Sequence, residues 1–395
     1  MRSLGRNVIK LSWYQQTGPF VLNPAPVEGS KHEWAEISHR SPFDKLRANG
    51  ERLLSRSERP LILKFNDIGS GLYRSLFCLG FLFLAASNGP RAEAPSDPPV
   101  TRIAFGSCNK QDQPQPLWDV IGAGRPELWI WLGDAIYGDT EDMDLLAAKW
   151  RQQKEVPAYA RFRAAVKVLG TWDDHDYGIN DGGAAYPKQA ESQRLFLDFL
   201  DEPADSPRRR QKGVYTSRSF GPEGNRICVV LLDERTFRAP PHGEGDILGE
   251  AQWAWLEGVL KSSRAQLHIV GSGSQILPVE HRFEKWADYP GARARLLKLL
   301  ASVKNPLLLS GDRHFGEISK LAFPKESAPL YEVTSSGLTH HGSIKSEPNS
   351  WRVGEIFQDL NYGTLEINWA ARRAVAALHD AQGTLVRSVT LELEP

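Results

Sequence analysis

Residues 127–139 read ELWIWLGDAIYGD, an apolar run that stops at a cluster of polar side chains. The run contains no regularly spaced polar positions, which is typical of a strand covered on both faces. Five other stretches have the same form: VTRIAFGSC (100–108), AVKVLGTWDDHD (165–176), ICVVLLDER (227–235), LHIVGSGSQ (267–275) and PLLLSGDRHFG (306–316). In open α/β sheets, ligands bind beyond the carboxyl ends of the strands. The repeated pattern therefore predicts buried strands whose ends share a functional edge.

Helical patterns lie between these strands, at residues 141–154, 187–202, 249–262 and 291–303. After residue 325 the pattern changes to short strands separated by turns, at 329–336, 362–369, 373–380 and 384–393. These later strands predict an antiparallel second sheet. The two parts together predict a two-sheet α/β sandwich flanked by helices. With no internal repeat or long linker after residue 100, we expect one domain, over residues 95–395.

The charge balance and the cysteines exclude some classes of protein. Lys and Arg together number 48, as do Asp and Glu, so the net charge gives no basic surface for nucleic acid. Three scattered cysteines do not make a disulfide framework. Cys228 lies inside an apolar run and is expected to be plain core. We expect a monomer.

Residues 72–94 have the layout of a secretory signal peptide, in which Arg74 precedes an apolar run that ends in small residues. The run is shorter than the ~20 residues that a membrane-spanning helix needs. A buried core helix is the alternative. The signal predicts a periplasmic or secreted protein, with membrane contact only through an uncleaved signal segment. Residues 1–71 lack periodicity and are expected to be either a non-native leader or a disordered extension.

The stretch at 133–139 brings Asp134 and Tyr137 to one turn. A carboxylate and a phenol can both bind a hard cation, and phenolate oxygen suits a trivalent ion such as Fe(III). Taken alone, the same pattern also fits a turn aspartate beside a packing tyrosine.

The stretch TWDDHDYGIND at 171–181 contains four acidic side chains within nine residues. Such charges repel one another unless a cation or hydrogen bonds offset them. Either a solvated acidic loop or a metal site explains the stretch. The buried strand before it and the histidine within it, His175, favour the metal site.

Three further strand ends carry polar groups. Asp312 and His314 are two positions apart, so both side chains can point from one turn into one cavity. Cys108 ends the first strand, where it is either a small buried residue or a metal-bound thiolate. Asp233 and Arg235 form either a surface ion pair or a site in which the guanidinium binds two phosphate oxygens.

In their order along the chain, these motifs resemble the PhoD-like alkaline phosphatase D family of the metallophosphatase superfamily. They are FGSC (105–108), GDAIYGD (133–139), TWDDHDYGIND (171–181), LLDERTFR (231–238) and SGDRHFGE (310–317). The resemblance implies a single catalytic domain with a four-layer αββα fold. It also implies a secreted phosphomonoesterase or phosphodiesterase that uses Fe(III) with one or more Ca(II) ions, other divalent metals being possible.

The family pattern implies roles for individual residues. It assigns iron to Cys108, Asp134 and Tyr137, with Asp312 or His314 completing the set. It assigns calcium to Asp134, Asp174 and Asn180. His175 would contact phosphate or protonate the leaving oxygen, and Arg235 would assist. The choice between Asp173 and Asp174 as metal ligand stays open, as does the role of His340 and His341.

Longer family members carry an additional N-terminal β-domain, whereas here the predicted signal peptide ends shortly before the first predicted strand. The substrates of those longer members therefore do not transfer to this chain, and the natural substrate stays open. We expect a small-molecule, lipid or nucleotide phosphate ester. A phospholipase-like or nucleotidase-like hydrolase is one alternative. A secreted protein that binds metal or phosphate without catalysis is the other.

Overall fold

The computed structural model describes residues 98–394, apart from 244, 323–327 and 344–345. All of these residues belong to one compact unit, Ser87–Pro395. The predicted leader (1–71) and signal peptide (72–94) lie outside the described residues. Within the described ranges, no helix is both long and apolar enough to cross a membrane.

The first sheet has six strands in the order β12-β11-β10-β1-β2-β3. Three of them, β1, β2 and β3, run parallel, and β10, β11 and β12 add an antiparallel half. The bounds are β1 Arg102–Gly106, β2 Leu128–Leu132, β3 Lys167–Thr171, β10 Tyr362–Asn368, β11 Arg373–His379 and β12 Leu385–Glu392.

The second sheet also has six strands, in the order β4-β5-β6-β7-β9-β8. Its four central strands are parallel, while β4 and β8 are antiparallel edge strands. The bounds are β4 Thr216–Phe220, β5 Ile227–Leu231, β6 Leu267–Gly271, β7 Pro306–Ser310, β8 Gly316–Leu321 and β9 Leu330–Ser335.

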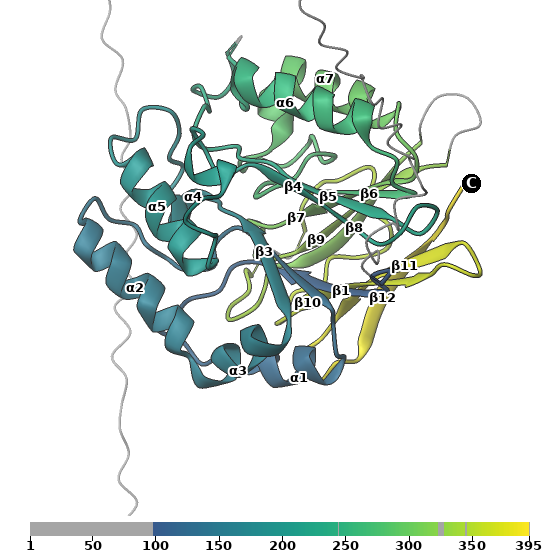
Figure 1. The fold of residues 1–395 in the computed structure, drawn as a ribbon, viewed down its shortest axis with the longest axis horizontal. Coiled ribbons are helices and arrows are strands. Elements are labelled where there is room, and N and C mark those ends of the chain that lie inside the picture. The colour runs from purple at the N-terminus through teal and green to yellow at the C-terminus, as the bar shows by residue number, and fades with distance from the viewer. Residues whose placement is uncertain (1–97, 244, 323–327, 344–345, 395) are drawn as a thin grey trace, which may run out of the picture. The chain divides into compact units, whose positions relative to one another are not determined.

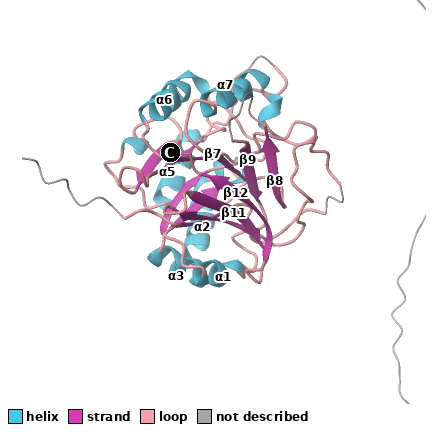
Figure 2. Cartoon of the chain, turned by 90° about the vertical axis from the view of Figure 1, so that its right-hand side faces the viewer, coloured by secondary structure: helices cyan, strands magenta, loops and turns pink. Residues whose placement is uncertain are grey.

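The two sheets pack face to face, with helices on both outer faces (Figures 1 and 2). Helices α6 and α7 cover the second sheet, and α1, α2, α3 and α5 cover the first. The position of strand β2 between two layers explains why its sequence is continuously apolar. Leu128, Ile130 and Leu132 face the core between the sheets, whereas Trp129 and Trp131 face the helices. Side chains alternate along a strand, so a strand covered on both faces needs apolar residues at every position.

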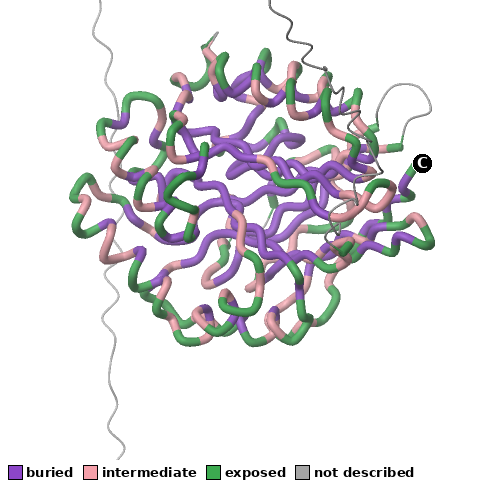
Figure 3. Tube along the Cα trace, in the orientation of Figure 1, coloured by how far each residue is buried: buried purple, intermediate pink, exposed green. Residues whose placement is uncertain are grey.

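The helices lie close to the predicted ranges. They are α1 Leu117–Ala123, α2 Met143–Glu155, α3 Pro157–Ala165, α4 Asp174–Tyr177, α5 Gln189–Phe199, α6 Gly249–Ser262 and α7 Pro290–Leu300. The four predicted helices correspond to α2, α5, α6 and α7, and α1, α3 and the short α4 were not predicted. In Figure 3 the central strands are buried and the outer faces of the helices are exposed, which is the amphipathic pattern from which the helices were predicted.

The αββα architecture is confirmed, but the predicted division of strands between the sheets is wrong. The late strands β10, β11 and β12 do not form a second sheet, because they extend the sheet that begins with β1, β2 and β3. Strand β9 instead joins β7 as a parallel neighbour. Local patterning reports whether a strand is covered, while the identity of its neighbours depends on long-range pairing.

Candidate metal centre

The strand ends bring three metal-binding groups to one point. Cys108 follows β1, Asp134 follows β2 and His314 lies in the turn between β7 and β8. One ligand atom of each residue lies within 4.8 Å of the others. Cys108 Sγ is 3.4 Å from Asp134 Oδ2. A thiol, a carboxylate and an imidazole at this spacing form a donor set for a transition metal.

Tyr137 adds a phenol to this group. Its Oη lies 3.0 Å from His314 Nε2 and 2.9 Å from His340 Nε2. On its other side, the ring stacks on His175 with the ring centroids 4.1 Å apart. The predicted contribution of Tyr137 to the centre is therefore geometrically possible.

A second group of donors adjoins the first and shares one residue with it. Ligand atoms of Asp134, Asp174 and His175 lie within 4.8 Å of one another. Asp174, Asp181 and Glu284 form a third group within the same limit. Asp134 and Asp174 thus link neighbouring donor groups, which is the arrangement required to hold two or more cations close together.

The structure distinguishes Asp173 from Asp174. Asp173 is fully buried, and its Oδ1 accepts a hydrogen bond from Arg235 Nε at 2.7 Å. It also forms a capping box with Asp176 at the start of α4. Asp174 belongs to two of the donor groups, and its carboxylate accepts the backbone N–H groups of His175 and Asp181. Among the described residues, Asp174 therefore belongs to the donor groups, whereas Asp173 does not.

Arg235 lies in a buried ion-pair network. Its guanidinium is only 1% exposed and binds Asp173 and Glu284. Although burial opposes its charge, these two carboxylates hold the pKa of Arg235 above its usual range. The expected phosphate-binding guanidinium is therefore engaged by carboxylates. Glu284 also pairs with Arg238.

Asp312 belongs to none of the donor groups found among the described residues. Asp312 is half-buried, and burial raises the pKa of its carboxyl to about 7. The structure brings His314 rather than Asp312 into the compact group with Cys108. Asn180 is exposed in the loop after α4, next to Asp181.

His175 is oriented by an aspartate that sequence reasoning did not single out. Its Nδ1 lies 2.8 and 2.9 Å from the two carboxylate oxygens of Asp139. Burial opposes protonation of the imidazole, but the hydrogen bond to Asp139 and the charge of Asp174 outweigh it, so the pKa of His175 is raised. The second Gly-Asp pair of GDAIYGD was the available signal for Asp139.

The electrostatics of the donors fit a bound cation. Burial, together with nearby negative charges, raises the pKa of Asp134 well above its usual value, and burial raises that of Cys108 to about 11. Among the described residues, Asp134 Oδ1 is buried without a hydrogen-bond partner. A buried polar atom normally has a partner, and a bound cation would supply one while ionising the thiol. The residues present therefore suit a metal ion.

The backbone at the strand ends is strained in a consistent way. Cys108, Asp134, Asp312 and His314 all have positive φ, between 50° and 67°. Non-glycine residues adopt this left-handed conformation at a cost, and such residues cluster at functional sites. Gly133 makes the turn at β2 possible, because a Cβ there would lie 2.3 Å from the Asp173 Cβ.

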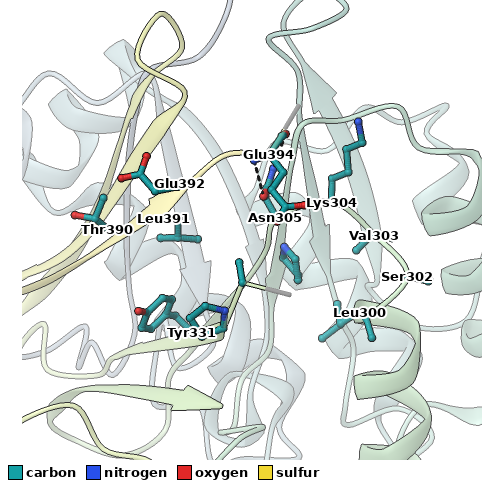
Figure 4. A pocket seen from close by; sticks show the side chains of 14 residues that line it. Leu300, Ser302, Val303, Lys304, Asn305, Tyr331, Thr390, Leu391, Glu392 and Glu394 are labelled. Carbon is teal, nitrogen blue, oxygen red and sulfur yellow. Dashed lines mark hydrogen bonds between the residues drawn. The ribbon is translucent and has the colours of Figure 1, made fainter. Parts of the chain in front are cut away.

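One cavity among the described residues lies away from these donors. It has a volume of about 370 Å³ and is lined by residues at the start of β7 and the end of β12 (Figure 4). The donors follow the other end of β7, so this cavity is not part of the candidate metal centre. Tyr331, Asn305 and Glu392 are among its lining residues.

Solved structures share this fold. A PhoD structure is 17% identical, with a TM-score of 0.63, and the match covers 76% of this chain and 71% of that one. GAP50 of Plasmodium is 13% identical over 75% of this chain and 90% of its own, with a TM-score of 0.52. A purple acid phosphatase from yellow lupin (Lupinus luteus) is 14% identical over 76% of this chain and 55% of its own, with a TM-score of 0.51.

Sequence comparison gives the family. No curated protein matches the chain. The family model for PhoD-like phosphatases matches residues 147–359, a range that includes Asp174, His175 and His314. The remaining donors, Cys108, Asp134 and Tyr137, precede the matched range but lie at the same strand edge. The chain belongs to the PhoD-like phosphatase family, whose members are metal-dependent hydrolases of phosphate esters.

Proposed function

We propose that this protein is an exported alkaline phosphatase or phosphodiesterase that uses Fe(III) together with Ca(II). The observation that carries the proposal is that Asp134 lies within 4.8 Å both of Cys108 and His314 and of Asp174, so that it is the common carboxylate of two neighbouring donor groups. His175, the third member of the second group, is assigned to catalysis rather than to metal. Two adjacent donor groups with a common carboxylate suit a multinuclear phosphoesterase.

The chemistry of the donors supports the choice of metals. A thiolate, a phenolate and an imidazole from Cys108, Tyr137 and His314 suit iron. The carboxylates of Asp174 and Asp181, together with the amide oxygen of Asn180, suit calcium, which prefers carboxylate and carbonyl ligands. Glu284 belongs to the same group but is paired with Arg235 and Arg238. Elemental analysis of protein that lacks residues 1–94 tests this choice, and zinc or manganese in place of iron would contradict it.

Different residues of the chain have different roles in the proposed hydrolysis. When bound, the metals supply Lewis acidity, which lowers the pKa of a water molecule and offsets phosphoryl charge. Asp134 and Asp174 each belong to two donor groups, so they hold neighbouring cation sites close together. His175, held by Asp139, is positioned to protonate the leaving oxygen as the bond from phosphorus to that oxygen breaks.

Metal removal is expected to abolish activity. Chelation of the purified protein should stop hydrolysis of an aryl phosphate monoester and of the corresponding diester, because the nucleophile in this proposal is a water molecule whose pKa the metals would lower. Returning iron and calcium together should restore both reactions, and each ion alone should restore less. Rates that are indifferent to chelation would contradict the proposal.

Replacing His175 tests its role as the general acid. We expect His175→Asn to slow hydrolysis by about 10²- to 10⁴-fold for an alkyl phosphate, because general acid catalysis contributes about that much. The loss should be much smaller for a nitrophenyl phosphate, whose leaving oxygen needs little protonation. Steady-state rates for the two esters measure the difference. An equal loss for both would assign His175 to phosphate binding.

The substrate class and the cellular location each need a separate experiment. A small-molecule ester, a phospholipid and a nucleotide all present the same phosphoryl group, so a panel of the three gives the substrate class. Phosphate binding at equilibrium without turnover would favour a non-catalytic binding protein. The apolar run after Arg74 supports export, and recovery of full-length protein in the cytoplasmic fraction of the native cell would contradict it.

A further inference from the structure

The loop after β9, residues 336–342, contacts the candidate metal centre at two of its donors. It comes from the segment TSSGLTHHG, in which His340 and His341 had no assigned role. Ser336 Oγ lies 2.9 Å from Cys108 Sγ, and His340 Nε2 lies 2.9 Å from Tyr137 Oη. Both contacts reach a group that becomes an anion when it binds metal.

Ser336 links two donors of the centre. Its Oγ accepts the backbone N–H of His314 at 2.6 Å. Between Oγ and the sulfur of Cys108, either atom can be the donor while the cysteine is a thiol. Once the sulfur is a thiolate, only the serine O–H can donate, and a hydrogen bond to a charged acceptor is stronger than one between neutral groups. Ser336 is therefore positioned to donate a hydrogen bond to a thiolate at Cys108.

Thr339 fixes the loop at the position from which His340 reaches Tyr137. The backbone N–H of Thr339 lies 3.4 Å from the carbonyl oxygen of Cys108, and Thr339 Oγ1 accepts the N–H of Lys110 at 2.8 Å. Oγ1 also lies 3.2 Å from His340 Nδ1. With both ring nitrogens in contact with named partners, the imidazole has a defined orientation.

His340 reaches the phenol without joining the compact donor groups. Its ring lies edge to face against Tyr137 and against His314, with ring centroids 5.1 and 4.6 Å apart. Among the described residues, the groups whose ligand atoms lie within 4.8 Å of one another include His314 but not His340. The geometry therefore suits a hydrogen bond to Tyr137 rather than a bond to the metal. The neighbouring His341 is exposed, and its Nδ1 lies near the carbonyl oxygen of Gly342.

We propose that Ser336 and His340 are positioning residues of the metal centre, where Ser336 holds the sulfur of Cys108 and His340 holds the phenol oxygen of Tyr137. The proposal rests on the proposed function, because it requires that these two donors bind metal. Groups that orient metal ligands typically change metal affinity by about 10- to 100-fold when they are removed.

Two pairs of adjacent variants test the proposal. Ser336→Ala is compared with Ser335→Ala, because Ser335 is equally buried but its hydroxyl binds Asn361. His340→Phe is compared with His341→Phe, which changes the exposed neighbour. Each full-length protein is loaded with Fe(III), and separately with Co(II), and metal loss to a chelator is timed. The phenolate-to-iron and thiolate-to-cobalt absorption bands are recorded.

Ser336→Ala should lose metal about 10- to 100-fold faster and shift the thiolate band, while His340→Phe should do the same with the phenolate band. The two control variants should match the wild type. His340→Gln, which keeps an N–H donor, and Ser336→Thr, which keeps the hydroxyl, should recover part of the effect and guard against a folding defect.

Unchanged rates and unchanged bands in both test variants would overturn the proposal. Equal changes in a test variant and its neighbouring control would also overturn it, because the effect would then be one of folding. If the wild-type protein took up neither ion, the proposed function would be wrong, and this proposal would fail with it.

Discussion

Asp134→Asn is expected to lower kcat/KM for an aryl phosphate by at least about 10³-fold, which corresponds to about 4 kcal/mol of transition-state stabilisation. Asp134 is 1% exposed and is the residue shared by two donor groups. Asparagine preserves the shape of the side chain but removes its charge, so both groups lose an anionic ligand at once. Steady-state kinetics and the metal content of the same preparation measure the effect.

Asp112→Asn is the matched control for this variant. Asp112 is exposed in the loop after Cys108 and belongs to none of the donor groups found among the described residues. The control should retain wild-type metal content and wild-type rates. If Asp134→Asn kept both its metal and its activity, Asp134 would have no role in the centre, and the multinuclear arrangement would be wrong.

Arg235→Leu is expected to destabilise the fold by about 3–5 kcal/mol, because removing one partner of a buried ion pair leaves the other charge buried and unpaired. In this variant Asp173 loses its guanidinium, whereas Glu284 keeps its ion pair with Arg238. Asp173 is 0% exposed and has no route to solvent for its charge. Urea unfolding, followed by fluorescence of the tryptophans, measures the change in the free energy of unfolding.

Arg295→Leu provides the comparison. Arg295 pairs with two glutamates on the surface, Glu250 and Glu257, and exposed ion pairs contribute only about 0–1 kcal/mol. A stable Arg235→Leu protein with a strongly raised KM would contradict the structural role. That result would support the alternative role predicted from the LLDER motif, in which Arg235 binds phosphate.

Local sequence patterns predicted most of the described strands and the helices α2, α5, α6 and α7, but not α1, α3 or α4. The run at 127–139 predicted β2, and the helical pattern at 249–262 predicted α6. The first depends on an unbroken apolar run and the second on helical periodicity, and both are properties of neighbouring residues. The same applies to the donor types, because Asp134, Tyr137 and His314 each directly follow a recognisable strand. The order of these motifs along the chain was sufficient to identify the family.

Only the tertiary structure decided which of these groups meet. Arg235 reaches Asp173 across 62 positions of sequence, and Ser336 reaches Cys108 across 228. No local pattern encodes such a contact, because it depends on which strands become neighbours in the two sheets. The same long-range pairing separates Asp173, which is buried against an arginine, from Asp174, which joins the donor groups. The sequence alone thus determined the elements and their chemistry, whereas their partners required the packed sheets.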